Sequence, residues 1–175
     1  MTTQLERRVV GRRSTVAEVV EAGSLAGLVG GLAMLVVAIV YSAAAGHGPW
    51  APLHAIAATV VGSTVATEMS PLAVGVAGLL VHAIVSIGFG IVFAALMPRT
   101  VPAAPAFALA AFAGVSILVV MSLAVLPLVN PVARSHFMWG SSPGAVPVVV
   151  AFAMHLAYGA GLSLAPWLRR RIAAP

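Results

Sequence analysis

Several residue types that soluble proteins use freely are absent from this chain of 175 residues. There is no cysteine, which excludes disulfides, thiolate metal sites and cysteine nucleophiles. There is also no lysine and no aspartate, and only 7% of the residues are charged, against about a quarter in a soluble domain. So few charges cannot cover a water-facing surface, which excludes an ordinary soluble domain.

Apolar residues make up 61% of the chain, and the mean hydropathy is +1.09. Four long runs without acidic or basic residues lie at about 24–45, 71–97, 105–126 and 146–167. A helix needs roughly 20 apolar residues to cross the hydrocarbon core, and each run meets that requirement. The sequence therefore predicts an all-α membrane protein in which residues 24–167 form a bundle of four transmembrane helices.

The arginines predict the orientation in the membrane. They give a net charge of +5, but they flank the apolar runs, so we expect the lipid bilayer and not nucleic acid as the partner. They gather in a basic juxtamembrane segment (1–23), at Arg99 between spans two and three, and in a basic tail (168–175). Because arginine favours the cytoplasmic side, we expect both termini in the cytoplasm, in a bacterial inner membrane.

The segments outside the spans carry three further predictions. Thr15 and Glu18 fit a capping box, which predicts the start of an amphipathic N-terminal helix there. Residues 53–66 are apolar but short, which indicates an interfacial or re-entrant helix. Glu68 and Arg134 lie in the two outer loops, about 46–70 and 127–145, and could pair across them.

The two halves of the chain resemble each other. Residues 78, 82, 86 and 90 of span two form a stripe of small residues around His82, and residues 151, 155, 159 and 163 form a similar stripe around His155. Spans one and three also align, which predicts two duplicated helix–loop–helix units inserted the same way up. Small residues let membrane helices pack closely, so we expect the following to face other helices: Gly23, Gly27, Gly31, Gly78, Ser86, Gly90, Ala151, Gly159 and Ser163.

His82 and His155 have three open interpretations. They could donate hydrogen bonds between helices, ligate a haem b iron as an axial pair, or line a path for protons or small solutes. A bare metal site is less favoured, because no carboxylate or thiolate accompanies these imidazoles within the spans. Serine and glutamate are too scattered for a hydrolase site, so we expect no enzyme activity.

The chain resembles a loose group of uncharacterised small bacterial integral membrane proteins with four helices. The resemblance rests on the segments 27–34 of span one and 155–162 of span four, and on the His82 stripe. It implies the topology and no activity. From the residues, the favoured function is a non-catalytic structural or accessory subunit of a homo-oligomer or a larger membrane complex. Haem b binding and small-solute or ion translocation are the alternatives.

Overall fold

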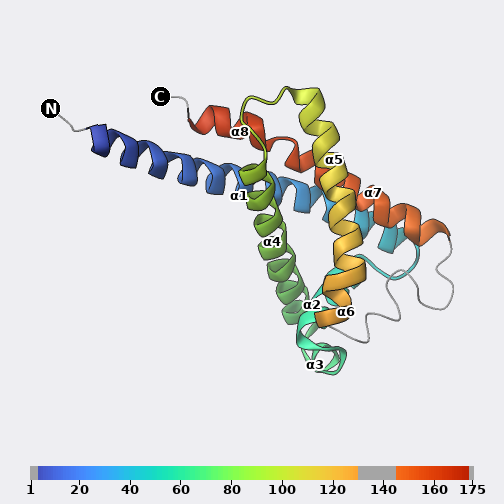
Figure 1. Cartoon of the computed structure of the whole chain (residues 1–175). Helices are drawn as coiled ribbons and strands as arrows, with labels where there is room; N and C mark the ends of the chain where they lie inside the picture. Colours follow the sequence, from blue (N-terminus) through green and yellow to red (C-terminus); the bar gives the residue numbers. More distant parts are fainter. Residues whose placement is uncertain (1–3, 130–144, 174–175) are drawn as a thin grey trace.

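The computed structural model describes residues 4–129 and 145–173, and within these ranges every regular element is a helix (Figure 1). Four helical stretches are long and apolar enough to cross a membrane: Val16–Ala44, Pro71–Leu96, Ala103–Val129 and Val148–Ile172. This confirms the prediction of an all-helical chain with four membrane-spanning segments.

The first span belongs to α1 (Gln4–Ala44), a single helix of 41 residues. The predicted helix start at Thr15 is therefore wrong, because α1 begins at Gln4 and passes through this position without a break. A cap accepts hydrogen bonds from the free N–H groups of the first helical turn, whereas the N–H groups in a helix interior already donate to carbonyls of the same helix. In the last turn of α1, the Ser42 hydroxyl donates a hydrogen bond of 2.7 Å to the carbonyl of Gly48, which lies in the loop that follows.

The outer loop after α1 folds into two short helices, α2 (Ala51–Val61) and α3 (Ser63–Glu68). They are separated by Gly62, whose φ of +86° favours glycine. The short helix predicted at 53–66 is thus present, divided in two. α2 lies against the next span so closely that a Cβ at Gly78 would come within 2.0 Å of the Leu53 carbonyl oxygen.

The second span is α4 (Pro71–Leu96), whose first turn is capped by the Ser70 hydroxyl. A short connection leads to α5 (Ala103–Val120), which continues through a π-helical turn, η1 (Met121–Val125), into α6 (Leu126–Val129). The last span comprises α7 (Ala145–Leu162) and, after a turn at Ser163 and Leu164, α8 (Ala165–Ile172). Residues 168–172, predicted to belong to a basic tail, are therefore helical.

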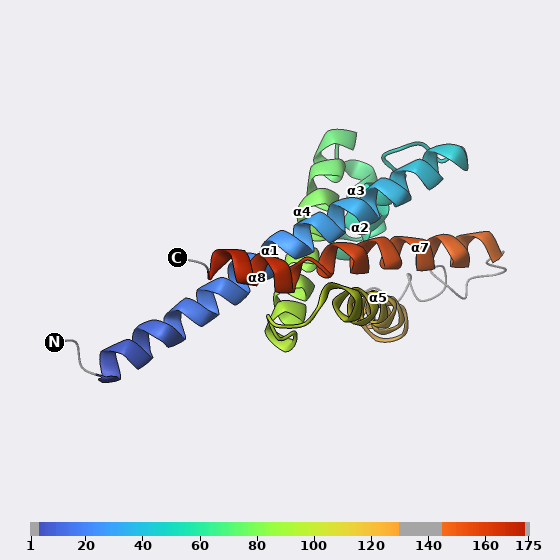
Figure 2. The same cartoon turned by 90° about the horizontal axis from the view of Figure 1, so that it is seen from above.

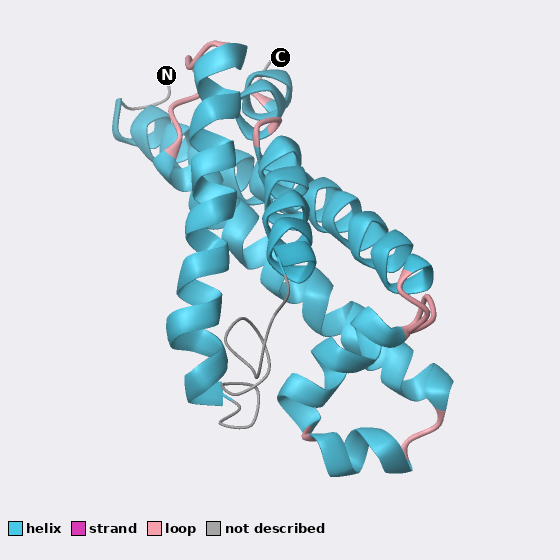
Figure 3. Ribbon diagram, turned by 90° about the vertical axis from the view of Figure 1, so that its right-hand side faces the viewer, coloured by secondary structure: helices cyan, strands magenta, loops and turns pink. Residues whose placement is uncertain are grey.

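The long helices form an open row in the order α4, α1, α7, α5. α1 packs along both α4 and α7, and α7 packs along α5, whereas α4 and α5 make no extensive contact with each other. Figures 1 and 2 show α1 and α7 side by side, with α4 and α5 crossing them on either side, and Figure 3 shows the same helices from a third direction. A buried hydrophobic cluster joins α1, α4, α5, α7 and α8 and consists of Ala26, Phe93, Ala94, Met97, Ala110, Tyr158, Leu162 and Ala165.

Candidate functional site

A buried ion pair joins the first helix of the chain to the last. The Nε of Arg169, on α8, donates a hydrogen bond of 3.0 Å to Oε1 of Glu18, on α1. Glu18 is 3% exposed and Arg169 is 8% exposed, so the pair is shielded from solvent. Each charge of a buried ion pair stabilises the other, because removal of one partner would leave the other buried without an opposite charge.

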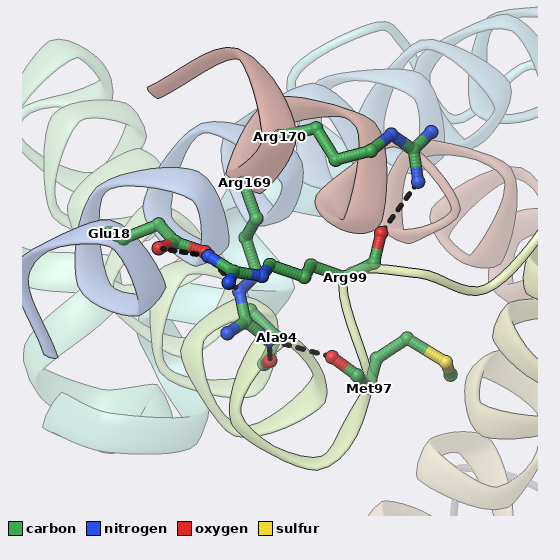
Figure 4. A network of polar contacts seen from close by, with 6 residues as sticks. All are labelled: Glu18, Ala94, Met97, Arg99, Arg169 and Arg170. Atoms are coloured by element: carbon green, nitrogen blue, oxygen red, sulfur yellow. Dashed lines mark hydrogen bonds and ion pairs between the residues drawn. The ribbon is translucent and has the colours of Figure 1, made fainter. Parts of the chain in front are cut away.

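Arg169 also binds the end of α4. Its Nη1 donates to the carbonyl oxygens of Ala94, at 2.8 Å, and Met97, at 2.7 Å (Figure 4). The last carbonyls of a helix have no partner within the helix, and the helix dipole makes this end negative. One guanidinium therefore satisfies both the carboxylate of α1 and the C-terminal carbonyls of α4.

Two further arginines extend this network at the same end of the molecule. Nη1 of Arg99, in the connection between α4 and α5, lies 3.7 Å from Oε2 of Glu18. Nη1 of Arg170 donates to the Arg99 carbonyl oxygen across 2.6 Å (Figure 4). Glu18, Arg99, Arg169 and Arg170 are named here the end network. It holds α1, α4, α8 and the α4–α5 connection together. Its residues come from the three arginine-bearing segments that were predicted to lie on the same side of the membrane, and they meet at one end of the molecule.

His82 links α4 to α1. Its Nε2 lies 2.9 Å from the carbonyl oxygen of Gly31, and because a carbonyl only accepts, this nitrogen carries the hydrogen. Close beside it, a Cβ at Gly31 would come within 2.5 Å of the Ser86 Oγ. His82 therefore lies in a tight contact between two spans.

His155 has different surroundings. It is 5% exposed, and its Nδ1 donates to the Ala151 carbonyl of its own helix across 2.8 Å. Its backbone lies against α5, since a Cβ at Gly114 would come within 2.2 Å of the His155 carbonyl oxygen. The two histidines thus belong to separate interfaces, His82 to the α1–α4 contact and His155 to the α5–α7 contact.

The predicted packing glycines lie where two helix backbones approach each other. A Cβ at Gly27 would come within 2.3 Å of the Ser86 carbonyl oxygen, and one at Gly90 within 2.2 Å of the Gly23 carbonyl oxygen. On the other side of the row, a Cβ at Gly159 would lie 2.5 Å from the Ala110 carbonyl oxygen. Of the remaining small residues in this set, Ala151 is buried and Ser163 is half-buried.

This arrangement does not fit an axial pair of haem ligands. The space beside Gly78 and Gly159, which the haem hypothesis needs for the macrocycle, is filled by the backbones of Leu53 and Ala110. The Nε2 of His82 is engaged with Gly31. In residues 4–129 and 145–173, no three histidine or acidic side chains come together in a way that could hold a metal ion.

Of the loop pair predicted from the sequence, the structure describes Glu68. Glu68 is exposed at the end of α3, whereas Arg134 lies outside the described residues. The end network, in contrast, was missed in the sequence. Glu18 was interpreted as a helix cap and Arg169 as a membrane-side marker. The available signal was that two of the four glutamates of the chain, Glu18 and Glu21, lie just before an apolar run.

No protein family, curated protein or solved structure matches the chain. The fold and the end network define a helical protein with four candidate membrane spans, fastened at its arginine-rich end by a buried ion pair.

Proposed function

We propose that the chain is a non-catalytic structural or accessory subunit that packs against further copies of itself or against a larger complex in a bacterial inner membrane, with both termini in the cytoplasm. The observation that carries this proposal is the open row of helices. α4 and α5 each pack along one neighbouring span and not along each other, so both offer long apolar faces to the bilayer or to a partner.

An exposed glycine on α4 favours a protein partner over lipid alone. Gly88 is exposed, and a Cβ placed there would meet nothing within 4 Å. Glycine destabilises a helix by about 1 kcal/mol relative to alanine, so a glycine that faces only lipid lowers helix stability without making a compensating contact. In membrane proteins, close packing of a second helix against a small residue offsets this loss of helix stability.

The alternatives have less support. Haem binding does not suit the contacts of His82, as described above. A path between the histidines does not suit their separate interfaces, His82 on α1 and the His155 backbone on α5. No catalytic role is proposed, because the buried charges of the end network neutralise one another and bind backbone carbonyls.

The test is the mass of the protein in lipid nanodiscs, measured by light scattering, together with cross-linking in native membranes. We expect an assembly larger than one chain that survives Gly88→Ala and is lost in Gly88→Leu. Ala160→Leu, which adds similar bulk to an exposed position of α7, serves as the control. A single chain in nanodiscs that forms no cross-links in native membranes would overturn the proposal.

A further inference from the structure

An open cleft of about 340 Å³ lies beside the end network, between the start of α5 and the junction of α7 with α8. Val101, Ala103 and Ala106 line one wall, and Leu164, Trp167 and Arg170 line the other. The lining is mostly apolar, and Ser163 and the guanidinium of Arg170 supply its polar groups. This combination suits a ligand that has an apolar body and an anionic group.

The cleft lies where the last span ends. α8 carries Arg169, Arg170 and Arg171 in its last turn, directly after the apolar α7. Trp167 is half exposed, and tryptophan concentrates at the level of lipid headgroups because its ring has one polar edge. A short helix with apolar residues on one side and arginines on the other is typical of the membrane interface. The cleft therefore opens toward lipid.

The charges around the cleft are predominantly positive. Arg99, Arg170 and Arg171 are exposed, while Glu18 is buried against Arg169. Among the residues whose exposure the structure describes, Glu21 of α1 is the exposed acidic residue at this end of the molecule. The hydrogen bonds of Arg170 to the carbonyls of Arg99 and Val101 both use Nη1. A guanidinium has five N–H donors, so the Nε and Nη2 donors of Arg170 are not used by these two bonds.

Arg171, the next residue of α8, contacts one of the residues that line the cleft. Its guanidinium carbon lies 5.4 Å from the centre of the Trp167 ring, in a cation–π contact. Trp167 itself lines the cleft, so Arg171 adjoins the cleft through this ring, whereas Arg170 belongs to its lining. Guanidinium groups are well suited to phosphate oxygens, which accept several N–H donors at once.

We propose that this cleft binds one anionic phospholipid. An acyl chain lies against Ala103, Leu164 and Trp167, and the headgroup phosphate accepts hydrogen bonds from Arg170 and Arg171. A lipid is favoured over free phosphate because the lining is apolar and the cleft opens at the end of a membrane span. This site is independent of the subunit role, since a lone chain and an assembled one would both offer it.

The test is native mass spectrometry of the full chain released from mild detergent. Equal concentrations of phosphatidylglycerol and phosphatidylcholine are added in separate samples, and inorganic phosphate is added in a third. The wild type should retain one phosphatidylglycerol in clear preference to phosphatidylcholine. Arg170→Gln should lower that retention about fivefold, the effect expected for one arginine at an anionic lipid surface.

Two variants separate charge from shape, and one serves as a control. Arg170→Lys, which keeps the charge, should retain more lipid than Arg170→Gln. Ala103→Trp fills the cleft without changing any charge and should also lower retention, which keeps the test valid if Arg170→Gln fails to fold. Arg8→Gln removes the same charge from the N-terminal part of α1, which projects away from the other helices (Figure 2), and should leave retention unchanged.

Three outcomes would overturn the proposal. Equal retention of the two lipids would show that the headgroup charge is not recognised. Arg170→Gln and Ala103→Trp variants that both retain lipid like the wild type would place the lipid elsewhere. Displacement of the lipid by millimolar inorganic phosphate would show that the site recognises a free anion and not a membrane lipid.

Discussion

Nε of Arg169 and Oε1 of Glu18 lie 3.0 Å apart although 151 positions separate the two residues. This hydrogen bond fastens the end of the last helix to the start of the first span. The carbonyls of Ala94 and Met97 bind the same guanidinium, so α4 is fixed at the same point. In a row of helices that is open along its length, the end network provides a point where α1, α4 and α8 are held together.

Removing the carboxylate should destabilise the protein strongly. Glu18→Gln leaves Arg169 buried with its two carbonyl acceptors but without an opposite charge, and Arg99 then adds a second unpaired cation nearby. We expect a loss of about 3 kcal/mol in the free energy of unfolding, at the lower end for a broken buried pair. Unfolding in mixed micelles by added sodium dodecyl sulfate, followed by circular dichroism, measures this.

Glu21→Gln is the matched control for that experiment. Glu21 lies three positions further along α1, but its side chain is exposed. The same chemical change there should shift the free energy of unfolding by no more than about 0.5 kcal/mol. Equal effects of the two substitutions would show that Glu18 contributes nothing through its burial.

A second prediction separates the charge of Arg169 from its shape. Lysine keeps the positive charge, but a single ammonium cannot replace a guanidinium that donates to the carboxylate through Nε and to two carbonyls through Nη1. Arg169→Lys should therefore lose about 1.5 kcal/mol, the value of one hydrogen bond to a charged group. Arg171→Lys, at an exposed position, should be close to neutral in the same assay, and a neutral Arg169→Lys would show that charge alone suffices.

The haem hypothesis leads to a spectroscopic prediction. Since Nε2 of His82 donates to Gly31 and helix backbones fill the space beside Gly78 and Gly159, we expect no stoichiometric Soret band in gently purified protein. A pyridine haemochrome assay on material from the native host measures bound haem directly. A stoichiometric band that disappears in both His82→Ala and His155→Ala would contradict the arrangement of these helices.

The four spans could be predicted because the thickness of the bilayer sets the length of every apolar run. The ends of the helices were harder to predict, because local chemistry decides them. The last span, predicted at about 146–167, overlaps a candidate span that runs to Ile172, but the break inside it was not predicted. α7 ends at Leu162 and a new helix starts at Ala165, with Pro166 in its first turn. Proline at that position is a start signal that hydropathy does not register.

The end network could not be predicted, because its residues come together only through the tertiary arrangement of α1 and α8. The duplication stays a prediction, and the aligned glycines differ in their partners. When spans one and three are aligned, Gly30 falls at the position of Gly114. Gly114 packs against His155, whereas Gly30 packs against Tyr158 and Gly161. Periodicity assigns a residue to a face of a helix, but it does not say which helix covers that face.

The contact between α1 and α4 gives the sharpest comparison, because one helix carries two glycines in opposite surroundings. A Cβ at Gly90 would come within 2.2 Å of the Gly23 carbonyl oxygen and 2.7 Å of the Gly27 Cα. Both are backbone atoms and cannot move without separating the helices, so Gly90→Ala should cost about 2 kcal/mol, as overpacking does in other cores. Two positions earlier, a Cβ at Gly88 meets nothing within 4 Å. Gly88→Ala should therefore be neutral or stabilising by up to about 1 kcal/mol, through helix propensity alone. Unfolding of both variants in the same micelles tests the contact, and equal stability of the two would mean that α1 and α4 do not approach as closely as this structure places them.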